Sequence, residues 1–418
     1  MEQGFIDAGR RVLQEMATMG LTFAVASAAA LAAVVAVAAV VRGRPYVFFV
    51  SVILGVHTLV SVALARNLGW AWPAYAYLQA SVYVHFLSLA RPVLRPLWYR
   101  FLVSIPASFF LAGTLLGFPW AILYAIGLHP WAPWLPYVVA LAGVVDSLFV
   151  RDEEVNLVLD GSVVDGLRRA ARGTGRSPRP LRIVQITDPH LGPFMSVKRL
   201  RTICERAVEK NPDLVLLTGD FLTMESQGSA AYLSEALSPL RALPGRVFAC
   251  RGNHDLEAPS IVAEACRAAG ARLLVDEAAV VDTPAGKVEI LGFDFRFQGR
   301  AEHVARVSAE HPRHDGELRI VLLHDPGAFR HVPEGAADLV LSGHTHGGQL
   351  GLLWLGLEST IVSALTSLPD HGFWALGTNR LYVHRGTGHY GFPLRVGVPA
   401  EQSLLAVHAL LAPFARET

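Results

Sequence analysis

Five apolar stretches before Arg151 constrain the fold of this chain more than any other feature of its sequence. They cover residues 18–41, 46–65, 68–90, 101–125 and 131–150. Each is close to the roughly 20 residues that an α-helix needs to cross a bilayer. A buried helical domain of a soluble protein is the alternative, but these runs leave too few polar faces for one. Residues 1–150 are therefore expected to form a transmembrane helical domain of about five spans.

The arginines that flank these stretches predict the side of the membrane on which the rest of the chain lies. With five spans, Arg10, Arg11 and Arg66 fall on one side, against Arg42, Arg44, Arg91, Arg95, Arg100 and Arg151 on the other. Because basic residues are enriched in cytoplasmic loops, the C-terminal half is expected on the cytoplasmic face of a multi-pass protein of the plasma or inner membrane. The opening GRRVLQ weakly resembles a twin-arginine signal, which would instead indicate export.

Residues 151–182 are expected to form a juxtamembrane segment and a basic linker. The stretch 165–182 is rich in Gly, Pro and Ser and carries many arginines. It is either a solvated tether or a contact for anionic lipid headgroups, which is worth on the order of 1 kcal/mol per basic residue.

From Leu181 the pattern changes to short apolar runs that alternate with helical segments. The runs LRIVQIT, PDLVLLTGD, RVFACRGNHD, LRIVLLHDP and ADLVLSGHTH each start like a buried strand and end on polar residues. This rhythm favours an α/β core, in which ligands collect at the carboxyl ends of strands. Residues 183–418 are expected to form this domain.

Potential metal ligands follow each of these runs: Asp188, His190, Asp220, Asn253, His254, His324, His344 and His346. A lone histidine is more often structural than a ligand, but five strand ends with such groups are improbable for packing reasons alone, because burying them uncompensated costs several kcal/mol each. Oxygen and imidazole donors without thiolate suit Mn, Fe or Zn, and two such ions about 3.5–4 Å apart clamp a phosphoryl group. The set predicts two divalent metal ions, with Asp220 as the natural bridging carboxylate.

The motifs TDPHLG, LTGDF, RGNHD, LLHDP and SGHTHGGQ, in this order, resemble the calcineurin-like metallophosphoesterase family. The later stretch NRLYVHRGTGHYGFPLRVGVPAEQSLL is similar to the C-terminal end of its membrane-associated bacterial branch. The resemblance implies a four-layer α/β/β/α sandwich with a dinuclear site between the sheets. Pro189 departs from the family pattern, but it fixes φ there without removing a ligand.

The resemblance also implies the role of each site residue. One metal would be bound by Asp188, His190, Asp220 and His346, and the other by Asp220, Asn253, His324 and His344. His254 would be catalytic, stabilising the phosphoryl oxygens or protonating the leaving group during attack by a metal-bridging hydroxide. Asp255 would either orient His254 or serve as a turn residue or helix cap.

Two further candidates are weaker. GTGHYG at 386–391 matches a dinucleotide-binding pattern, but FPLRVGVP follows it and cannot open a helix. The resemblance makes it a glycine-rich loop near the active site, in which Arg385 is either a phosphate contact or a structural arginine. The cysteines, Cys204, Cys250 and Cys266, are expected as reduced thiols, with Cys250 an apolar filler rather than a nucleophile.

The stretch LGLLWLGLESTIVSALTSL at 350–368 is unusually apolar for a loop region. It is either a core helix or an apolar surface that dips into the bilayer and admits a lipid. The second alternative is favoured because the domain is tethered to membrane helices, and it predicts a lipid-linked phosphoester or pyrophosphate as substrate.

The sequence thus predicts a membrane-anchored phosphoester hydrolase with a dinuclear metal site, partnered by the bilayer and a phosphorylated substrate. A non-catalytic membrane receptor or scaffold with the same fold is one alternative, and a phosphodiesterase for soluble nucleotides is another. The complete ligand set and His254 favour an enzyme. A net charge of only +1 and the lack of a basic, aromatic-interleaved groove argue against nucleic acid as a partner.

Overall fold

The computed structural model describes residues 2–65, 71–174, 177–314, 316–389 and 394–409, with side chains from Thr18 onward. The chain divides into two compact units, Met1–Val145 with Phe392–Leu394, and Asp146–Gly391 with Arg395–Thr418. Arg66 and Arg176 of the predicted basic flanks, and Tyr390 and Gly391 of the glycine-rich stretch, lie outside the described residues.

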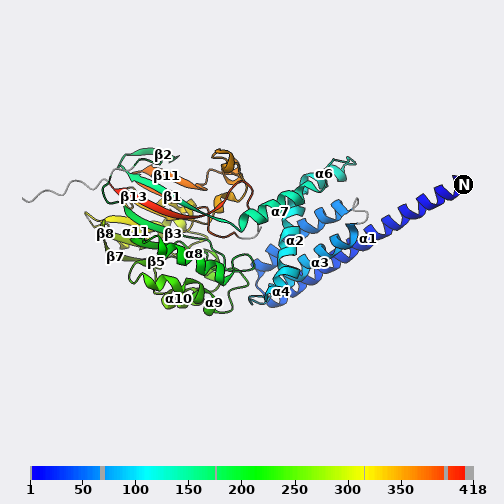
Figure 1. Cartoon of the computed structure of the whole chain (residues 1–418), viewed down its shortest axis with the longest axis horizontal. Coiled ribbons are helices and arrows are strands. Elements are labelled where there is room, and N and C mark those ends of the chain that lie inside the picture. The colour runs from blue at the N-terminus through cyan, green and yellow to red at the C-terminus, as the bar shows by residue number, and fades with distance from the viewer. Residues whose placement is uncertain (1, 66–70, 175–176, 315, 390–393, 410–418) are drawn as a thin grey trace, which may run out of the picture. The chain divides into compact units, whose positions relative to one another are not determined.

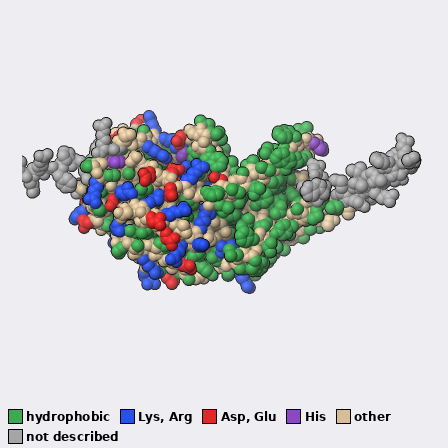
Figure 2. All heavy atoms as spheres, in the orientation of Figure 1, with side chains coloured by type: hydrophobic (Ala, Val, Ile, Leu, Met, Phe, Trp, Pro, Cys, Tyr) green, Lys and Arg blue, Asp and Glu red, His purple; other side chains and the backbone are tan. Residues whose placement is uncertain are grey.

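The first unit is built from apolar helices (Figure 1). They are α1 Glu2–Val41, α2 Arg44–Leu64, α3 Trp72–Ser88, α4 Leu97–Tyr99, α5 Ile105–Leu116, α6 Phe118–Ala125 and α7 Leu135–Ser147, with a π-helical turn, Arg100–Ser104, between α4 and α5. Hydrophobic side chains cover most of the face of this unit that Figure 2 shows, whereas charged side chains of both signs cover the other unit. The first unit therefore has the surface of a membrane-embedded bundle.

Three segments of the described chain are long and apolar enough to cross a membrane, not the expected five. They are Thr18–Val41, Arg44–Leu64 and Leu97–Leu116. The third and fifth predicted spans correspond to α3, with 17 residues, and α7, with 13, which at about 1.5 Å per residue fall short of a hydrocarbon core about 30 Å thick. The fourth predicted span is divided at Gly117, because Pro119 has no amide hydrogen with which to continue the helix.

A cluster of polar side chains, here called the Gln79 cluster, is buried among α1, α2 and α3. The Gln79 side-chain oxygen accepts a hydrogen bond from Ser61 Oγ at 2.8 Å and lies 3.0 Å from His57 Nε2. Its amide nitrogen donates to the Tyr83 hydroxyl at 2.8 Å and to Ser27 Oγ at 3.2 Å. Both polar atoms of the Gln79 side chain are thus satisfied within the helices.

The strands that the structure describes in the second unit form two mixed sheets. One has the order β1-β13-β3-β4-β5-β6 and the other β2-β11-β12-β10-β9-β8-β7. The strands are β1 Val150–Leu159, β2 Val164–Arg169, β3 Leu181–Ile186, β4 Leu214–Leu217, β5 Val247–Ala249, β6 Arg272–Leu273, β7 Glu277–Thr283, β8 Gly286–Gly292, β9 Leu318–Leu322, β10 Leu339–Ser342, β11 Gly372–Gly377, β12 Asn379–Val383 and β13 Ala400–Ala409. The helices are α8 Val197–Glu209, α9 Ala230–Leu237, α10 Pro259–Ala268, α11 Arg300–Glu310 and α12 Ile361–Leu365.

Alternation along the strands sorts their side chains into three cores. In β4, Leu214 and Leu216 pack between the two sheets, whereas Val215 and Leu217 pack with residues of α8, α9 and α10. In β10, Leu339 and Leu341 join the core between the sheets, and Val340 packs with residues of α11. Helices therefore cover the outer face of each sheet, and the predicted mixed α/β fold is confirmed.

Part of the segment expected as a linker is built into these sheets instead. β1 pairs in parallel with β13 along its whole length, and β2 pairs antiparallel with β11. Val155 and Leu157 of β1 are buried in the core between the sheets. The expected linker at 151–182 is therefore corrected: its first half is sheet, and its strand character depends on partners at the far end of the chain.

Candidate active site

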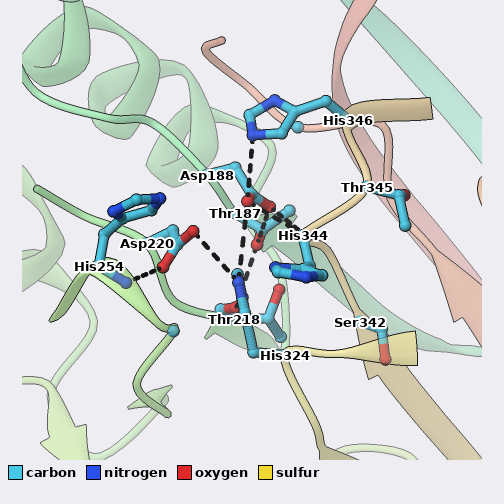
Figure 3. A network of polar contacts seen from close by, with 12 residues as sticks. Thr187, Asp188, Thr218, Asp220, His254, His324, Ser342, His344, Thr345 and His346 are labelled. Atoms are coloured by element: carbon cyan, nitrogen blue, oxygen red, sulfur yellow. Dashed lines mark hydrogen bonds and ion pairs between the residues drawn. The ribbon is translucent and has the colours of Figure 1, made fainter. Parts of the chain in front are cut away.

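The predicted ligands lie in loops at the carboxyl ends of parallel strands. β3, β4 and β5 are parallel neighbours in one sheet, and β9 and β10 are parallel neighbours in the other. Because parallel strands end at the same edge of a sheet, their loops meet there. Asp188 and His190 follow β3, Asp220 follows β4, Asn253 follows β5, His324 follows β9, and His344 and His346 follow β10. Figure 3 shows Asp188, Asp220, His324, His344 and His346 converging from these loops.

The side chains form two adjoining groups. Asp188, His190 and His346 are one, and Asp220, His324 and His344 are the other; within each, one donor atom of every residue lies within 4.8 Å of the others. His346 Nε2 is 3.4 Å from Asp188 Oδ1, and His324 Nε2 is 3.3 Å from Asp220 Oδ2. His190 Nε2 lies 3.7 Å from Asp220 Oδ2, which links the groups. The structure thus brings six of the predicted ligands together in two neighbouring groups.

The backbone carries strain at most of these positions. Asp188, His190, Asp220, His344 and His346 have φ of 51°, 48°, 54°, 70° and 52°, the left-handed region that L-residues avoid. Each such residue costs on the order of 1–3 kcal/mol, and such residues cluster at functional sites. This strain is stored around the donor atoms.

Two glycines allow the loops to approach the carboxylates closely. A Cβ at Gly343 would lie 2.1 Å from Asp188 Oδ2, and one at Gly252 would lie 2.1 Å from Asp220 Oδ1. With glycine at 343, the amide of His344 donates to Asp188 Oδ2 at 3.0 Å. Glycine at these positions is therefore a requirement of the site.

The orientation of the donor atoms fits bound cations. Nδ1 of His190 lies 3.2 Å from the carbonyl oxygen of Leu222, and Nδ1 of His324 lies 2.6 Å from that of Thr218. A proton on each Nδ1 leaves the Nε2 lone pair directed into the site, as in metal-binding histidines. Among the described residues, the buried Oδ1 of Asn253 has no hydrogen-bond partner. An amide oxygen is a suitable ligand for a divalent cation.

The electrostatics of the site also favour cations. Burial raises the pKa of Asp188 to about 6. Burial acts in the same direction on Asp220, but His324, His190 and His254 hold its pKa well below the usual range. Burial alone would lower the pKa of His324, yet Asp220 and Asp188 raise it to about 10. The protonated imidazole of His324 thus compensates the negative charge of the two buried carboxylates. A divalent cation bound between them would compensate the same charge.

His254 lies beside the group of Asp220. Its backbone amide donates to Asp220 Oδ1 at 2.9 Å, its Nδ1 is 3.6 Å from Glu257 Oε1, and its ring centroid is 5.4 Å from that of His190. Burial acts to lower the pKa of His254, but the carboxylates of Glu257 and Asp220 outweigh it and raise the pKa above the usual value. A partly exposed imidazole is thus held next to the donor atoms.

Asp255 contacts the backbone of the site. Its carboxylate accepts hydrogen bonds from the amides of Asp220 at 2.8 Å, Phe221 at 2.9 Å and Gly252 at 2.9 Å. It is fully buried. Asp255 therefore ties the loop after β4 to the loop after β5, a role that neither sequence alternative described.

Arg385 is paired with carboxylates. It forms ion pairs with Glu401 at 2.5 Å and with Glu153. The partners come from β13 and β1, so this pairing depends on the strand arrangement that the sequence analysis missed. Gly386 and Gly388 of the same stretch do lie at the site, because a Cβ on them would meet His346 and Pro189.

Arg395 is a site residue that the sequence analysis did not identify. It is fully buried, its Nη2 lies 3.3 Å from His346 Nδ1, and it donates to the carbonyl oxygens of Arg385 at 2.7 Å and Gly388 at 2.5 Å. Burial lowers its pKa to about 9. It holds the glycine-rich loop against a candidate ligand. A charged residue within the apolar run FPLRVGVP is the signal that could have identified it.

Comparisons with known proteins match the part of the chain that carries these residues. The profile of the family described as calcineurin-like phosphoesterase matches residues 181–348. Phosphodiesterase YaeI of Escherichia coli K12 is 31% identical over 231 residues, which cover 54% of this chain and 82% of YaeI. A transmembrane protein with metallophosphoesterase domain from Danio rerio is 31% identical over 235 residues, covering 53% of this chain and 52% of that protein. UDP-2,3-diacylglucosamine pyrophosphatase LpxG of Chlamydia muridarum is 25% identical over 260 residues, covering 50% and 78%.

Proposed function

Because this chain belongs to the calcineurin-like phosphoesterase family, and is thus a metal-dependent phosphoester hydrolase, we propose that it acts at a membrane on a lipid-linked phosphoester or pyrophosphate. The observation that carries the catalytic part is the meeting of two groups of donors, on strained backbone, at the ends of both sheets. The support for the membrane part is the set of apolar helices and the relatives named as transmembrane proteins.

Two divalent cations fit the donors. Asp188, His190 and His346 would hold one, Asn253, His324 and His344 would hold the other, and Asp220 would contact both. Mn, Fe and Zn suit this oxygen and imidazole set. When bound, the cations would supply Lewis acidity, which polarises phosphoryl oxygens and makes water a stronger nucleophile at neutral pH.

His254 would act on the substrate side of this centre. It follows Asn253 directly, and its imidazole is partly exposed and near Glu257. Glu257 in turn accepts a hydrogen bond from Gln227 Nε2 at 2.8 Å, which restrains the carboxylate. The imidazole would then donate a hydrogen bond to a phosphoryl oxygen or pass a proton to the leaving group.

Hydrolysis by the purified full-length protein in detergent tests the catalytic part. We expect turnover of p-nitrophenyl phosphate, its bis ester or a lipid pyrophosphate that depends on added Mn, Zn or Mg. His254→Ala should keep bound metal but lower turnover by roughly 10²–10⁴-fold, the usual contribution of a general acid. Metal-loaded protein that hydrolyses none of these esters would support the receptor or scaffold alternative instead.

The catalytic domain is proposed to face the cytoplasm. The support is the count of arginines that flank the five predicted spans. With the three spans that the structure describes, Arg91 and Arg95 lie instead on the side of Arg10, Arg11 and Arg66, so the arginine count no longer favours this face and a direct measurement of sidedness is required. The native Cys204, Cys250 and Cys266 are unpaired and buried, so a single introduced thiol can report sidedness. Val163→Cys, at a residue 72% exposed, should resist a membrane-impermeant maleimide in intact cells and react after permeabilisation. Labelling in intact cells would show that the domain is exported.

A further inference from the structure

The stretch 350–368, here called the apolar lobe, is not the core helix that was one sequence alternative. Its helix α12, Ile361–Leu365, is only five residues long. Large apolar side chains of the lobe are exposed: Leu352, Trp354, Leu355, Leu357, Ile361 and Leu365 are 43–76% accessible. Such a concentration of apolar surface in one segment marks a binding surface.

The lobe is held firmly beside the metal ligands. It starts four residues after His346, and the amide of Gly351 donates to the carbonyl oxygen of Val396 at 2.9 Å. At its other end, the carbonyl oxygen of Asp370 accepts a hydrogen bond at 2.6 Å from the hydroxyl of Thr345, which lies between His344 and His346. Thr360 bonds to the Asp370 carboxylate, and Arg169 pairs with it at 3.1 Å. The exposed side chains are therefore presented by an ordered segment adjoining the donors.

A basic and aromatic loop, Phe295 to Arg300, lies on the side of the second group of donors. The Phe295 ring centroid is 6.0 Å from that of His324 and 5.8 Å from that of His344. Arg300 pairs with Asp325, the residue after His324, at 2.9 Å. The same loop leaves Phe297 67% exposed.

Of the two arginines in this loop, Arg296 has the longer ion-pair distance to a carboxylate. Among the described residues its carboxylate neighbour is Asp294, at 3.9 Å, and half of its side chain is exposed. Asp294 is already bound by Arg251, through Nε at 2.9 Å and Nη2 at 2.8 Å. The guanidinium of Arg296 therefore keeps capacity for an anionic ligand, which a phosphate would fill well.

The lobe and the basic loop meet at Gly327. A Cβ placed there would be 3.3 Å from Leu368 Cδ2 at the end of the lobe and 3.6 Å from Arg300 Nη1. An apolar surface and a cationic one thus border the same donors. This combination matches the chemistry of a lipid with an anionic headgroup.

Trp354 of the lobe also lies close to an arginine near the start of β1. The Arg151 guanidinium is 5.7 Å from the Trp354 ring centroid. Tryptophan and arginine are both favoured at the headgroup level of a bilayer.

We propose that the apolar lobe enters the boundary between headgroups and acyl chains and holds the apolar chain of a lipid diphosphate, while Arg296 pairs with the phosphoryl group that is not attacked. The inference rests on the proposed function and names the substrate class for the same site. A lipid monophosphate offers no second phosphoryl group to Arg296, and a soluble ester offers no chain to the lobe. Changes in the lobe should therefore alter the ratio of vesicle turnover to soluble-ester turnover. Changes at Arg296 should alter the ratio of diphosphate turnover to monophosphate turnover.

The test compares full-length protein, with its metal, on vesicles containing diacylglycerol pyrophosphate, on vesicles containing phosphatidic acid, and on p-nitrophenyl phosphate. Leu355→Asp should lower the ratio of vesicle to soluble turnover by about tenfold or more, the effect of one leucine removed from an apolar contact. Val280→Asp is the matched control, because Val280 is 52% exposed on β7 and outside the lobe. It should leave that ratio unchanged.

Arg296→Ala should lower the preference for the diphosphate over the monophosphate by about tenfold, as expected for a lost charge-assisted contact. Arg201→Ala, an exposed arginine of α8 paired with Glu205, is its control. Equal ratios in each variant and its control, with wild-type activity intact, would overturn this inference and leave the proposed function standing. Wild-type protein without activity on any of the three substrates would count against the proposed function itself.

Discussion

The Gln79 cluster and the candidate metal centre, formed by the two groups of donors around Asp188 and Asp220, are both buried and both contain histidine, yet they differ in how their polar atoms are satisfied. Around Gln79, regular helices bring donors and acceptors together in matching pairs. In the metal centre, His190 Nε2 and His346 Nε2 face each other at 3.1 Å, Asn253 Oδ1 has no partner among the described residues, and the ligand backbone is left-handed. Burial, residue type and a single unsatisfied atom do not separate a structural cluster from a reactive one, since Nδ1 of His57 also lacks a partner among the described residues. Left-handed backbone at the donor residues does separate them.

Replacing the shared carboxylate should have the largest effect. Asp220→Asn keeps the shape of the side chain but removes the charge that both groups of donors use. We expect metal affinity and turnover to fall by more than about a hundredfold, beyond the range for residues that only support a ligand. Metal content by mass spectrometry and hydrolysis of p-nitrophenyl phosphate measure this. Unchanged metal content would show that Asp220 does not bind both cations.

Removing the cations should lower the stability of the second unit and leave the stability of the first unit unchanged. At a metal concentration one hundred times the dissociation constant, the bound ion adds about 2.7 kcal/mol of stability, which a chelator removes. Hydrogen exchange should then accelerate in β3, β4 and β10 but not in α2 and α3. Equal acceleration in α2 would contradict the distinction between the two clusters, because the Gln79 side chain is hydrogen-bonded within the helices and needs no cation.

A variant at Asp255 tests whether a buried carboxylate that is fully hydrogen-bonded contributes to metal binding by positioning the ligands. Asn at this position has one acceptor oxygen, so Asp255→Asn cannot keep all the hydrogen bonds to the amides of Gly252, Asp220 and Phe221. We expect metal affinity to fall by about tenfold, as for other groups that position ligands. Titration calorimetry with Mn measures it, and Asp282→Asn, on β7, is a control that should leave the affinity unchanged.

Gln79→Leu should have the smallest effect and no effect on catalysis. Hydrogen bonds between side chains in membrane helices are worth about 0.6 kcal/mol each, so the loss in stability of the first unit should be small. Hydrogen exchange in α2 and α3 would detect it. A change in p-nitrophenyl phosphate turnover in this variant would mean that the Gln79 cluster has a functional role.

The sequence could predict which side chains meet at the ends of the strands, because each follows an apolar run that is recognisable within a few residues. Asp220, for example, ends a stretch whose strand character is local. Arg385 could not be assigned in this way, since its partners Glu153 and Glu401 lie on strands far from it in sequence. The spans were overestimated because hydropathy measures composition, whereas helix length depends on where Pro119 and neighbouring turns interrupt the hydrogen-bond ladder.

By itself, the sequence determined that a mixed α/β domain follows an apolar half and which family this domain belongs to, and it predicted which residues would hold metal. These properties reside in short motifs and in local periodicity. Only the tertiary structure decided that β1 and β2 belong to the sheets, that Arg395 supports His346, that Asp255 clamps two loops, and that the apolar lobe is exposed beside the ligands. Each of these depends on pairing between segments distant along the chain, and such pairing is selected by the packing of the whole domain rather than by any local stretch.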